Sequence, residues 1–338
     1  MKKKSFLVFI TVMLLTGILA ACGSSDDAST GSKDKIVIGY FPNINHVPAM
    51  VAKEKGFFQE QLGDGTVIEY RTFAEGGSFM TALKTGDVDA GLVGPGPAMN
   101  NYTTGADVKI IAGGSTGGTV VLAKAGSDIK SPEDFSGKTF ITPGIGCTHD
   151  VQYETYLEDL GVTSERIGGT MKHLTGNPAQ YSAMLEQGKI DVAVAPEPWA
   201  AQIQIETNAE VVIPWNEVSF GETLPASVLV TSGEMIENNP ETIEKIVNAH
   251  KQAVEFINDN PEEAKEITIK DIKDTTKQEL SKEVVDLAWE RIGFTYEVDQ
   301  DAVQAFADSS YALKFLKEQP DFTDLIDGQF IGTTTAGR

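Results

Sequence analysis

The chain is poor in cysteine, histidine and positive charge. Its 338 residues include two cysteines, four histidines, and 27 lysines and arginines against 49 acidic residues, for a formal net charge of −22. A surface with this excess of negative charge repels nucleic acid and anionic membrane surfaces. We therefore expect no nucleic-acid partner and no binding to a membrane through the overall charge.

The few histidines and cysteines also limit the chemistry available to the chain. None of the histidines stands at the spacing of metal ligands, so we expect no metal site. Cys147 and His149 lie two residues apart on one loop, a spacing that rarely lets a histidine activate a thiol. We expect no cofactor and no catalysis. The four histidines are His46, His149, His173 and His250.

One short motif resembles a nucleotide-binding loop. Gly137, Lys138 and Thr139 match the end of such a loop, but Pro132 replaces its first glycine. The residues that follow are predicted to form a strand, whereas a phosphate loop leads into a helix. The motif therefore does not predict nucleotide hydrolysis.

Long apolar runs are absent except near the N-terminus. Three lysines at positions 2–4 precede an apolar stretch over 6–19, which is shorter than the roughly 20 residues that cross a bilayer. This layout is typical of an export signal. The run Leu-Ala-Ala-Cys ending at Cys22 resembles a bacterial lipobox. That resemblance implies a signal peptide over 1–21, and a Cys22 that carries a diacylglyceryl group. An ordinary cleaved signal with an incidental cysteine is the alternative.

A polar segment follows the predicted lipidation site. Residues 22–35 are rich in Ser, Asp, Gly and Thr, and predict a flexible tether. With Cys22 acylated, Cys147 is left without a disulfide partner, so the fold depends on its core. We expect a protein anchored by lipid to the extracytoplasmic face of the cell membrane, with roughly 300 residues available for two domains.

The first part of the chain alternates between apolar runs and amphipathic segments. Such alternation predicts a parallel, doubly wound α/β sheet. Glycines mark the ends of both predicted helices, as is common at helix C-termini. The predicted elements are strands at 36–39, 67–70 and 90–93, and helices over 48–56 and 78–85.

The same pattern returns 102 positions later. A strand-like segment at 108–112 also matches the segment at 210–214 at this offset. A helix, a glycine, and a strand that all repeat at one spacing predict two similar lobes. The matching residues are Phe79, Leu83, Gly86, Val88 and Asp89, with Tyr181, Leu185, Gly188, Ile190 and Asp191.

We expect lobe 1 to comprise 36–122 and 228–338, and lobe 2 to comprise 123–227. The crossings near 122–124 and 223–228 would then be hinges that absorb the dihedral change when the lobes close. The tail beyond Gly233 has helical spacing and asparagine-proline helix starts, and is expected to cover lobe 1. Ligands bind at the carboxyl ends of strands in such sheets, which predicts a cleft between the lobes.

Three segments carry a family resemblance: 76–94 (GGSFMTALKTGDVDAGLVG), 131–143 (SPEDFSGKTFITP), and 188–200, which begins GKID and ends EPWA. With them, the chain resembles the solute-binding proteins of ABC importers in the nitrate, sulfonate and taurine group. The resemblance covers nearly all of the mature chain. It implies a type II periplasmic-binding-protein-like fold, in which two doubly wound α/β lobes close over one small ligand and deliver it to a membrane permease. We expect a monomer.

Three loops, 42–47, 75–78 and 144–148, lead into predicted helices. Free N–H groups at a helix start can hold an oxyanion without a lysine. We therefore expect a small organic anion, with an aliphatic sulfonate such as taurine, or nitrate, as ligand. A flat heterocycle such as a thiamine-precursor pyrimidine is the alternative, and an enzyme on the same fold is a more distant one.

The candidate ligand contacts stand where predicted strands end or helices begin. Several have a structural alternative: the glycine loop before Ser78 as a helix cap, 113–118 as a flexible crossover, and Trp199 as core. His149 is expected to supply positive charge and Glu197 to hold an amine. The candidates are Asn43, Asn45, His46, Gly76, Gly77, Ser78, Gly94, Pro95, Thr116, Gly117, Thr148, His149, Glu197 and Trp199.

Overall fold

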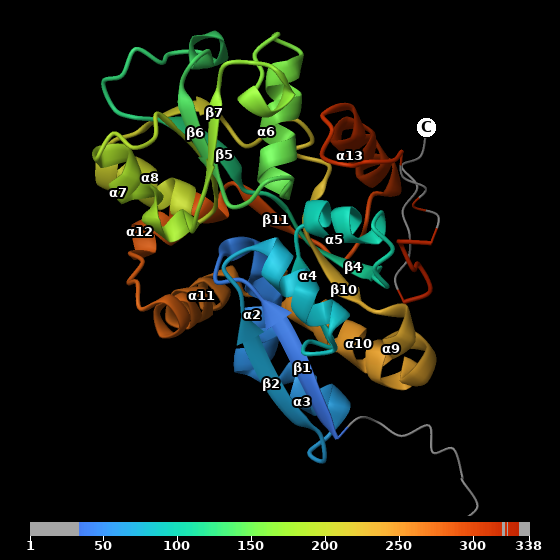
Figure 1. Cartoon of the computed structure of the whole chain (residues 1–338). Coiled ribbons are helices and arrows are strands. Elements are labelled where there is room, and N and C mark those ends of the chain that lie inside the picture. The colour runs from blue at the N-terminus through green and yellow to red at the C-terminus, as the bar shows by residue number, and fades with distance from the viewer. Residues whose placement is uncertain (1–33, 320–321, 323, 331–338) are drawn as a thin grey trace, which may run out of the picture. The chain divides into compact units, whose positions relative to one another are not determined.

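The computed structural model describes residues 34–319, 322 and 324–330 (Figure 1). The predicted signal peptide, Cys22 and nearly all of the predicted tether lie outside the described residues. Within the described residues, no helix combines the length and the apolar character that a membrane span needs.

Two β-sheets organise the described chain. The first has the strand order β11-β4-β10-β3-β1-β2, and the second has the order β7-β6-β8-β5-β9. The first sheet comprises β1 (Lys35–Tyr40), β2 (Val67–Thr72), β3 (Ala90–Val93), β4 (Lys109–Gly117), β10 (Pro225–Thr231) and β11 (Ile292–Phe294). The second comprises β5 (Thr119–Ala123), β6 (Thr139–Thr142), β7 (Lys172–Thr175), β8 (Val192–Pro196) and β9 (Glu210–Ile213).

The predicted internal repeat is confirmed by the sheet topology. The order β2-β1-β3-β10-β4 in the first sheet corresponds strand for strand to β7-β6-β8-β5-β9 in the second. The correspondence extends to single hydrogen bonds. The backbone N–H of Val37 donates to Asp89 at 2.8 Å, and that of Thr139 donates to Asp191 at 2.8 Å. The repeated aspartates therefore tie equivalent strands together in the two lobes.

The sheets are mixed rather than parallel, which corrects the sequence prediction. Strand β10 runs antiparallel to β3 and β4, and β5 runs antiparallel to β8 and β9. Each of these strands enters its sheet directly from the other lobe, so its direction is opposite to that of its helix-connected neighbours. The signal of strand-helix alternation does not carry this information.

The crossings between the sheets lie earlier in the chain than predicted. Because β5 belongs to the second sheet, the first crossing is at Gly117 and Gly118 instead of 122–124. Both glycines have φ of +79°, a conformation that other residues rarely adopt. The second crossing occupies 214–224, so most of the predicted hinge at 223–228 is strand β10.

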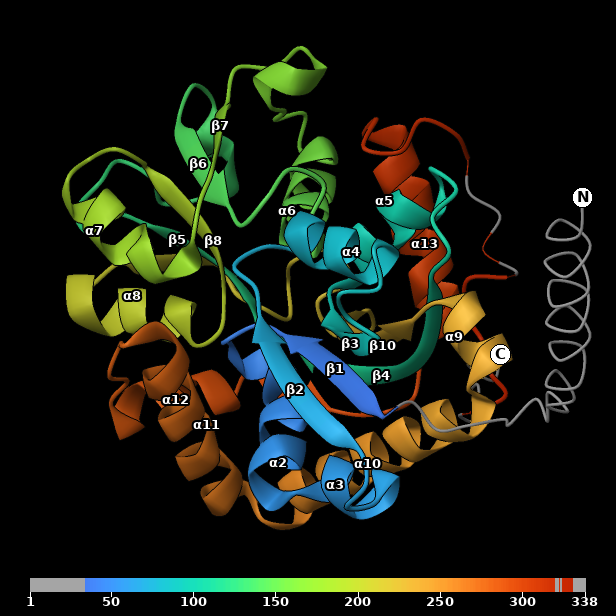
Figure 2. The ribbon, with the colours of Figure 1, turned by 60° about the horizontal axis from the view of Figure 1, so that its bottom comes forward.

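Helices cover both sheets, and the C-terminal helices reach both lobes. As predicted, α10 packs on α2 and α3, and α11 on α2; however, α12 contacts α8 and α13 contacts α6, both in the second lobe (Figure 2). The tail therefore packs on lobe 1, as expected, and contacts lobe 2 as well. The helices are α2 (Val47–Lys55), α3 (Phe57–Leu62), α4 (Gly76–Lys84), α5 (Pro95–Tyr102), α6 (Thr148–Glu158), α7 (Tyr181–Glu186), α8 (Trp199–Thr207), α9 (Gly233–Asn238), α10 (Pro240–Asp259), α11 (Pro261–Thr276), α12 (Lys282–Trp289) and α13 (Gln300–Ala312).

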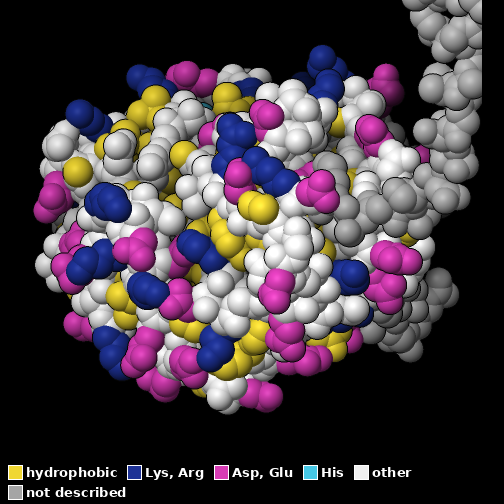
Figure 3. Space-filling model, turned by 90° about the horizontal axis from the view of Figure 1, so that it is seen from below, with side chains coloured by type: hydrophobic (Ala, Val, Ile, Leu, Met, Phe, Trp, Pro, Cys, Tyr) yellow, Lys and Arg dark blue, Asp and Glu magenta, His cyan; other side chains and the backbone are white. Residues whose placement is uncertain are grey.

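The second sheet is buried on both faces. Alternate residues of its strands enter two different hydrophobic clusters: Phe140 and Val192 enter one, and Ile141 and Ala193 enter the other. Side chains of a strand point to opposite faces in turn, so each cluster fills the space between one face and its helices. On the face seen from below, where the first lobe comes forward, basic and acidic side chains are interspersed (Figure 3).

Candidate ligand-binding site

A cleft of about 520 Å³ lies between the lobes, and residues of both lobes line it. Its size falls in the range of small-molecule sites. The cleft brings together eight of the fourteen residues predicted from the sequence, namely Asn43, Asn45, His46, Gly76, Gly94, Thr148, His149 and Trp199. The other six, Gly77, Ser78, Pro95, Thr116, Gly117 and Glu197, are not among its lining residues.

The loop after β1 forms one wall of the cleft. The Asn43 side chain accepts the backbone N–H of Asn45 at 3.0 Å, which shapes the turn before α2. Two serines hold Asn45 in place: Ser227 donates a hydrogen bond to its backbone carbonyl at 2.6 Å, and Ser115 donates one to its side-chain oxygen at 3.3 Å. The β4 and β10 strands therefore hold this loop in place at the cleft.

The side chain of Glu75, the residue before α4, caps the start of this helix. The carboxylate of Glu75, which lines the cleft, accepts the backbone N–H groups of Gly77 and Ser78, each at 2.6 Å. The Ser78 hydroxyl donates to the Glu75 carbonyl at 2.9 Å. Gly77 and Ser78 are thus part of a helix cap, the alternative that the sequence left open. A carboxylate already satisfies the donors that were predicted to hold an anion.

The start of α6 forms the facing wall and also joins the lobes. The Thr148 hydroxyl accepts the backbone N–H of Gly96 at 3.2 Å, and Asn100 donates to the Gly146 carbonyl at 2.9 Å. A Cβ on Gly94 would lie 2.5 Å from the Thr148 hydroxyl oxygen, so only glycine permits this approach. Cys147 is buried here, and burial raises the pKa of its thiol to about 12. It packs as a small neutral residue, as predicted.

Glu197 is not available to a ligand, which corrects its predicted role. Its side chain is fully buried, and Oε1 lies 2.7 Å from the Arg291 guanidinium. Oε2 accepts the backbone N–H of Ala201 at 2.9 Å. Burial raises the pKa of Glu197, although Arg291 opposes that shift. Both oxygens are used to fix the start of α8 and to attach it to the segment after α12.

Three more predicted contacts serve the fold instead of the cleft. Pro95 is the first residue of α5, a position that suits its missing N–H. Thr116 and Gly117 pair with Gly293 and Ile292 in the β4–β11 ladder. Residues 113–117 are therefore the end of strand β4, and only the crossing at 117–118 matches the crossover that the sequence suggested.

The two histidines of the cleft are uncharged near neutral pH. Burial, together with the nearby His149, lowers the pKa of His46 to about 3, and burial lowers that of His149 to about 4. His149 therefore does not supply the positive charge that was expected of it. Among the described residues, neither His46 Nδ1 nor His149 Nε2 has a hydrogen-bond partner. Both nitrogens are also buried, so each lacks contact with bulk water as well as a partner among these residues.

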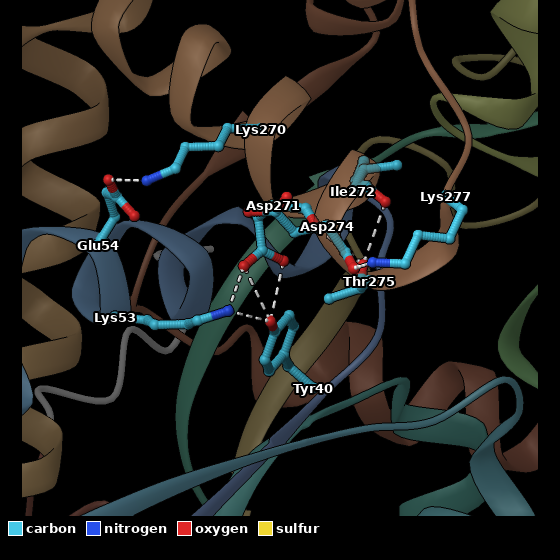
Figure 4. Close-up of polar contacts among 9 residues, drawn as sticks. All are labelled: Tyr40, Lys53, Glu54, Lys270, Asp271, Ile272, Asp274, Thr275 and Lys277. Carbon is cyan, nitrogen blue, oxygen red and sulfur yellow. Dashed lines mark hydrogen bonds and ion pairs between the residues drawn. The ribbon is translucent and has the colours of Figure 1, made fainter.

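Sequence reasoning missed the wall formed by the end of α11. Thr275, Thr276 and Gln278 line the cleft there. A buried network behind them holds α11 against the first sheet (Figure 4): the Tyr40 hydroxyl donates to both Asp271 oxygens, at 3.0 and 2.9 Å, and Lys53 pairs with Asp271. The helix was predictable, but the partner of Asp271, 231 positions away, left no local signal.

The cleft is rich in rings and amides and has little charge. Among the described residues, no lysine or arginine lines it, and Glu75 is its single carboxylate. Glu75 directly precedes α4, whereas the predicted helix began only at Ser78, so the sequence prediction did not assign Glu75 a capping role. The other lining residues that were not predicted include Phe41, Phe73, Asn177 and Gln180.

Comparison with known proteins gives the chain its family. A family model described as NMT1-like matches residues 29–270. The chain belongs to the NMT1-like family. Curated relatives of this NMT1-like chain include a binding protein of Brucella abortus (strain 2308), 25% identical over 66% of each chain, and the taurine-binding periplasmic protein of Escherichia coli (strain K12), 24% identical over 64% of each chain. The NMT1-like chain thus spans just under two thirds of the length of these relatives.

Solved structures confirm the predicted fold class of the NMT1-like chain. The alkanesulfonate-binding protein SsuA from Xanthomonas axonopodis pv. citri, bound to MOPS, superposes with a TM-score of 0.74 at 18% identity, covering 88% of this chain and 99% of that one. The two mixed sheets therefore form a type II periplasmic-binding-protein fold. The named relatives are binding proteins and not enzymes, in line with the expectation of no catalysis.

Proposed function

We propose that this NMT1-like chain is the solute-binding component of an ABC importer. It captures one small molecule in the cleft, acts as a monomer, and delivers the ligand to the permease subunits outside the cytoplasm. The cleft between two lobes and the binding proteins among its relatives support this function. The crossings at 117–118 and 214–224 are the proposed hinges.

The ligand is a planar nitrogen heterocycle, uncharged or cationic, such as a thiamine-precursor pyrimidine. One observation carries this choice: the described lining has no cationic side chain and contains the Glu75 carboxylate, which already caps α4. An anion that carries no amino group would face the Glu75 charge without a compensating cation. An amino group on a ring would instead gain a charge-assisted hydrogen bond, worth roughly 1.5–3 kcal/mol.

The remaining lining suits a flat polar ring. Phe41, Phe73 and Trp199 offer aromatic surfaces to the cleft. The neutral imidazoles of His46 and His149 offer an unpartnered nitrogen each. Rings that stack and side chains that can both donate and accept are what a heterocycle with ring nitrogens requires. These residues, with Asn43 and Thr148, are the proposed ligand contacts.

A small organic anion, a sulfonate or nitrate, is the second candidate. The start of α6, at Thr148 and His149, lines the cleft, and a helix N-terminus attracts negative charge. The taurine-binding relative in Escherichia coli favours the same ligand class. The anion would have to bind to α6, on the opposite wall from Glu75.

A thermal-shift series with pyrimidines, taurine, alkanesulfonates and nitrate separates the two candidates. A ligand at about 100 times its Kd stabilises the folded protein by about 2.7 kcal/mol, which raises the melting temperature. We expect a shift with an aminopyrimidine and none with a millimolar alkanesulfonate that carries no amino group. A shift with sulfonates alone would reject the heterocycle and leave the importer function intact.

The chain is held at the membrane through acylated Cys22, a residue outside the described part of the structure. Two acyl chains give stable anchoring where one would not. Cys22→Ser should move the protein from the membrane fraction to the soluble fraction without changing ligand affinity. Membrane retention of this variant would contradict the proposed anchor.

A further inference from the structure

A cluster of three potential metal ligands lies in the second lobe, outside the lining of the cleft. Asp150 and Glu154 stand one turn apart on α6, and His173 lies on the adjacent strand β7. One ligand atom from each of these side chains can be chosen so that all three atoms lie within 4.8 Å of one another. The histidine spacing did not predict this site, because it uses one histidine together with two carboxylates.

Each acidic side chain of the cluster has one oxygen without a hydrogen-bond partner. Asp150 is fully buried and Glu154 is 3% exposed. Among the described residues, nothing hydrogen-bonds to Asp150 Oδ1, to Glu154 Oε1 or to His173 Nδ1. Buried polar atoms are rarely left in this state, because each one loses its hydration without a replacement. Two such carboxylate oxygens one helical turn apart, with the His173 ring 3.6 Å from one of them, point to a bound species.

The remaining atoms of the two carboxylates are held by other groups. The backbone N–H of Gly146 donates to Asp150 Oδ2 at 2.8 Å. Ser164 and Arg166 donate to Glu154 Oε2 at 3.0 and 2.8 Å. Hydrogen bonds of this kind, which fix one oxygen and leave the other free, are typical of the surroundings of metal ligands.

The imidazole of His173 is fixed as well. Its ring stacks on Phe140 with centroids 4.3 Å apart and an angle of 9° between the planes. The Thr142 hydroxyl lies 2.7 Å from Nε2, and Asp150 Oδ1 lies 3.6 Å from the same nitrogen. The three side chains are therefore arranged before any ion arrives, which reduces the entropy lost on binding.

We propose that Asp150, Glu154 and His173 bind a divalent transition-metal ion, with Zn²⁺ as the probe. Two carboxylate oxygens and one imidazole nitrogen suit Zn²⁺ and its neighbours, whereas Ca²⁺ takes six to eight oxygens. The ion would neutralise the cluster, where Arg166 offsets only one of the two carboxylates. Because Arg166 also repels a cation, the site should bind more weakly than one without it. Its place beside the start of α6 would make the ion a structural brace for that wall of the cleft.

The test is metal content and affinity in the purified full chain. Bound metal is first removed with EDTA, and the protein is then dialysed against ZnCl₂ and against zinc-free buffer. We expect about one zinc ion per protein chain, measured by inductively coupled plasma mass spectrometry. His173→Gln and Glu154→Gln should weaken binding by at least about tenfold, because even outer-shell partners of a ligand contribute that much. His149→Gln is the matched control, since it removes a neutral imidazole from the cleft and should keep the zinc.

Two outcomes would overturn the proposal. If the wild type binds no more zinc than His173→Gln does, the cluster holds only a proton or water. Zinc lost from His149→Gln but kept by His173→Gln would place the ion in the cleft. Melting curves in EDTA show whether each variant folds. Should Glu154→Gln fail to fold, the visible absorbance of Co²⁺ bound to the wild type, and its loss in His173→Gln, decides the matter.

Discussion

The substitution Glu75→Gln tests directly whether the charge of Glu75 makes the cleft prefer a heterocycle to an anion. The substitution keeps the shape and one acceptor oxygen for the Gly77 and Ser78 N–H groups, but it removes the charge. Two unit charges about 6 Å apart interact by about 3 kcal/mol at an effective dielectric of 20, and by half that where water screens them more. Since Glu75 is only half-buried, we expect the lost charge to change affinity by about tenfold to 100-fold.

The direction of the change distinguishes the two ligand classes. Calorimetric titration should show weaker binding of an aminopyrimidine to Glu75→Gln, because a charge-assisted hydrogen bond is lost. Any binding of an alkanesulfonate that carries no amino group should become tighter, because a repulsion is removed. Asp107→Asn is a matched control: Asp107 likewise accepts two helix-start N–H groups, from Gly233 and Glu234, but lines no part of the cleft. Unchanged affinities in Glu75→Gln, or a weaker sulfonate, would refute the reasoning.

Two further predictions concern stability. Arg291→Met should lower the free energy of unfolding by about 3–5 kcal/mol, because it leaves Glu197 buried without its partner. Lys130→Met, which breaks an exposed pair with Glu210, should lower it by about 1 kcal/mol or less. Urea unfolding midpoints compare the two variants, and equal losses of stability would contradict the role of burial. Burial lowers the pKa of His250 to about 4, against about 6.5 in the unfolded chain, so below pH 6.5 the unfolded state binds a proton that the folded state excludes. Stability should therefore fall between pH 6.5 and 4, by up to about 3 kcal/mol from this group, and His250→Gln should flatten that part of the profile of urea midpoint against pH.

The parts of the fold that repeat were predictable from the sequence. Asp89 and Asp191 precede equivalent apolar runs, and the common offset of 102 residues matched the strands now seen as β3 and β8. Strand direction was not predictable in the same way, because β5 and β10 look like any other apolar run. Their orientation depends on which lobe the chain has just left.

For the site, the sequence predicted which loops line the cleft better than it predicted what their side chains do. Strand ends and helix starts identified the loops that meet at the cleft, since those ends lie together in such sheets. The roles failed where a distant or local partner intervened. Glu197 pairs with Arg291, 94 positions later, and no local pattern announces this. Gly77 and Ser78 give their N–H groups to Glu75, a competition that was missed because the helix was predicted to begin only at Ser78.

The central position of β10 has a consequence for the order in which the lobes can form. The second sheet is complete once Ile213 has been made, whereas β3 and β4 are joined only by β10, which ends at Thr231. A chain that emerges N-terminus first can therefore finish its second lobe while the first sheet is still divided. Domains that fold as units during synthesis commonly do so from the N-terminus. Here the inserted lobe would come first, and the lobe that contains β1 would be completed last.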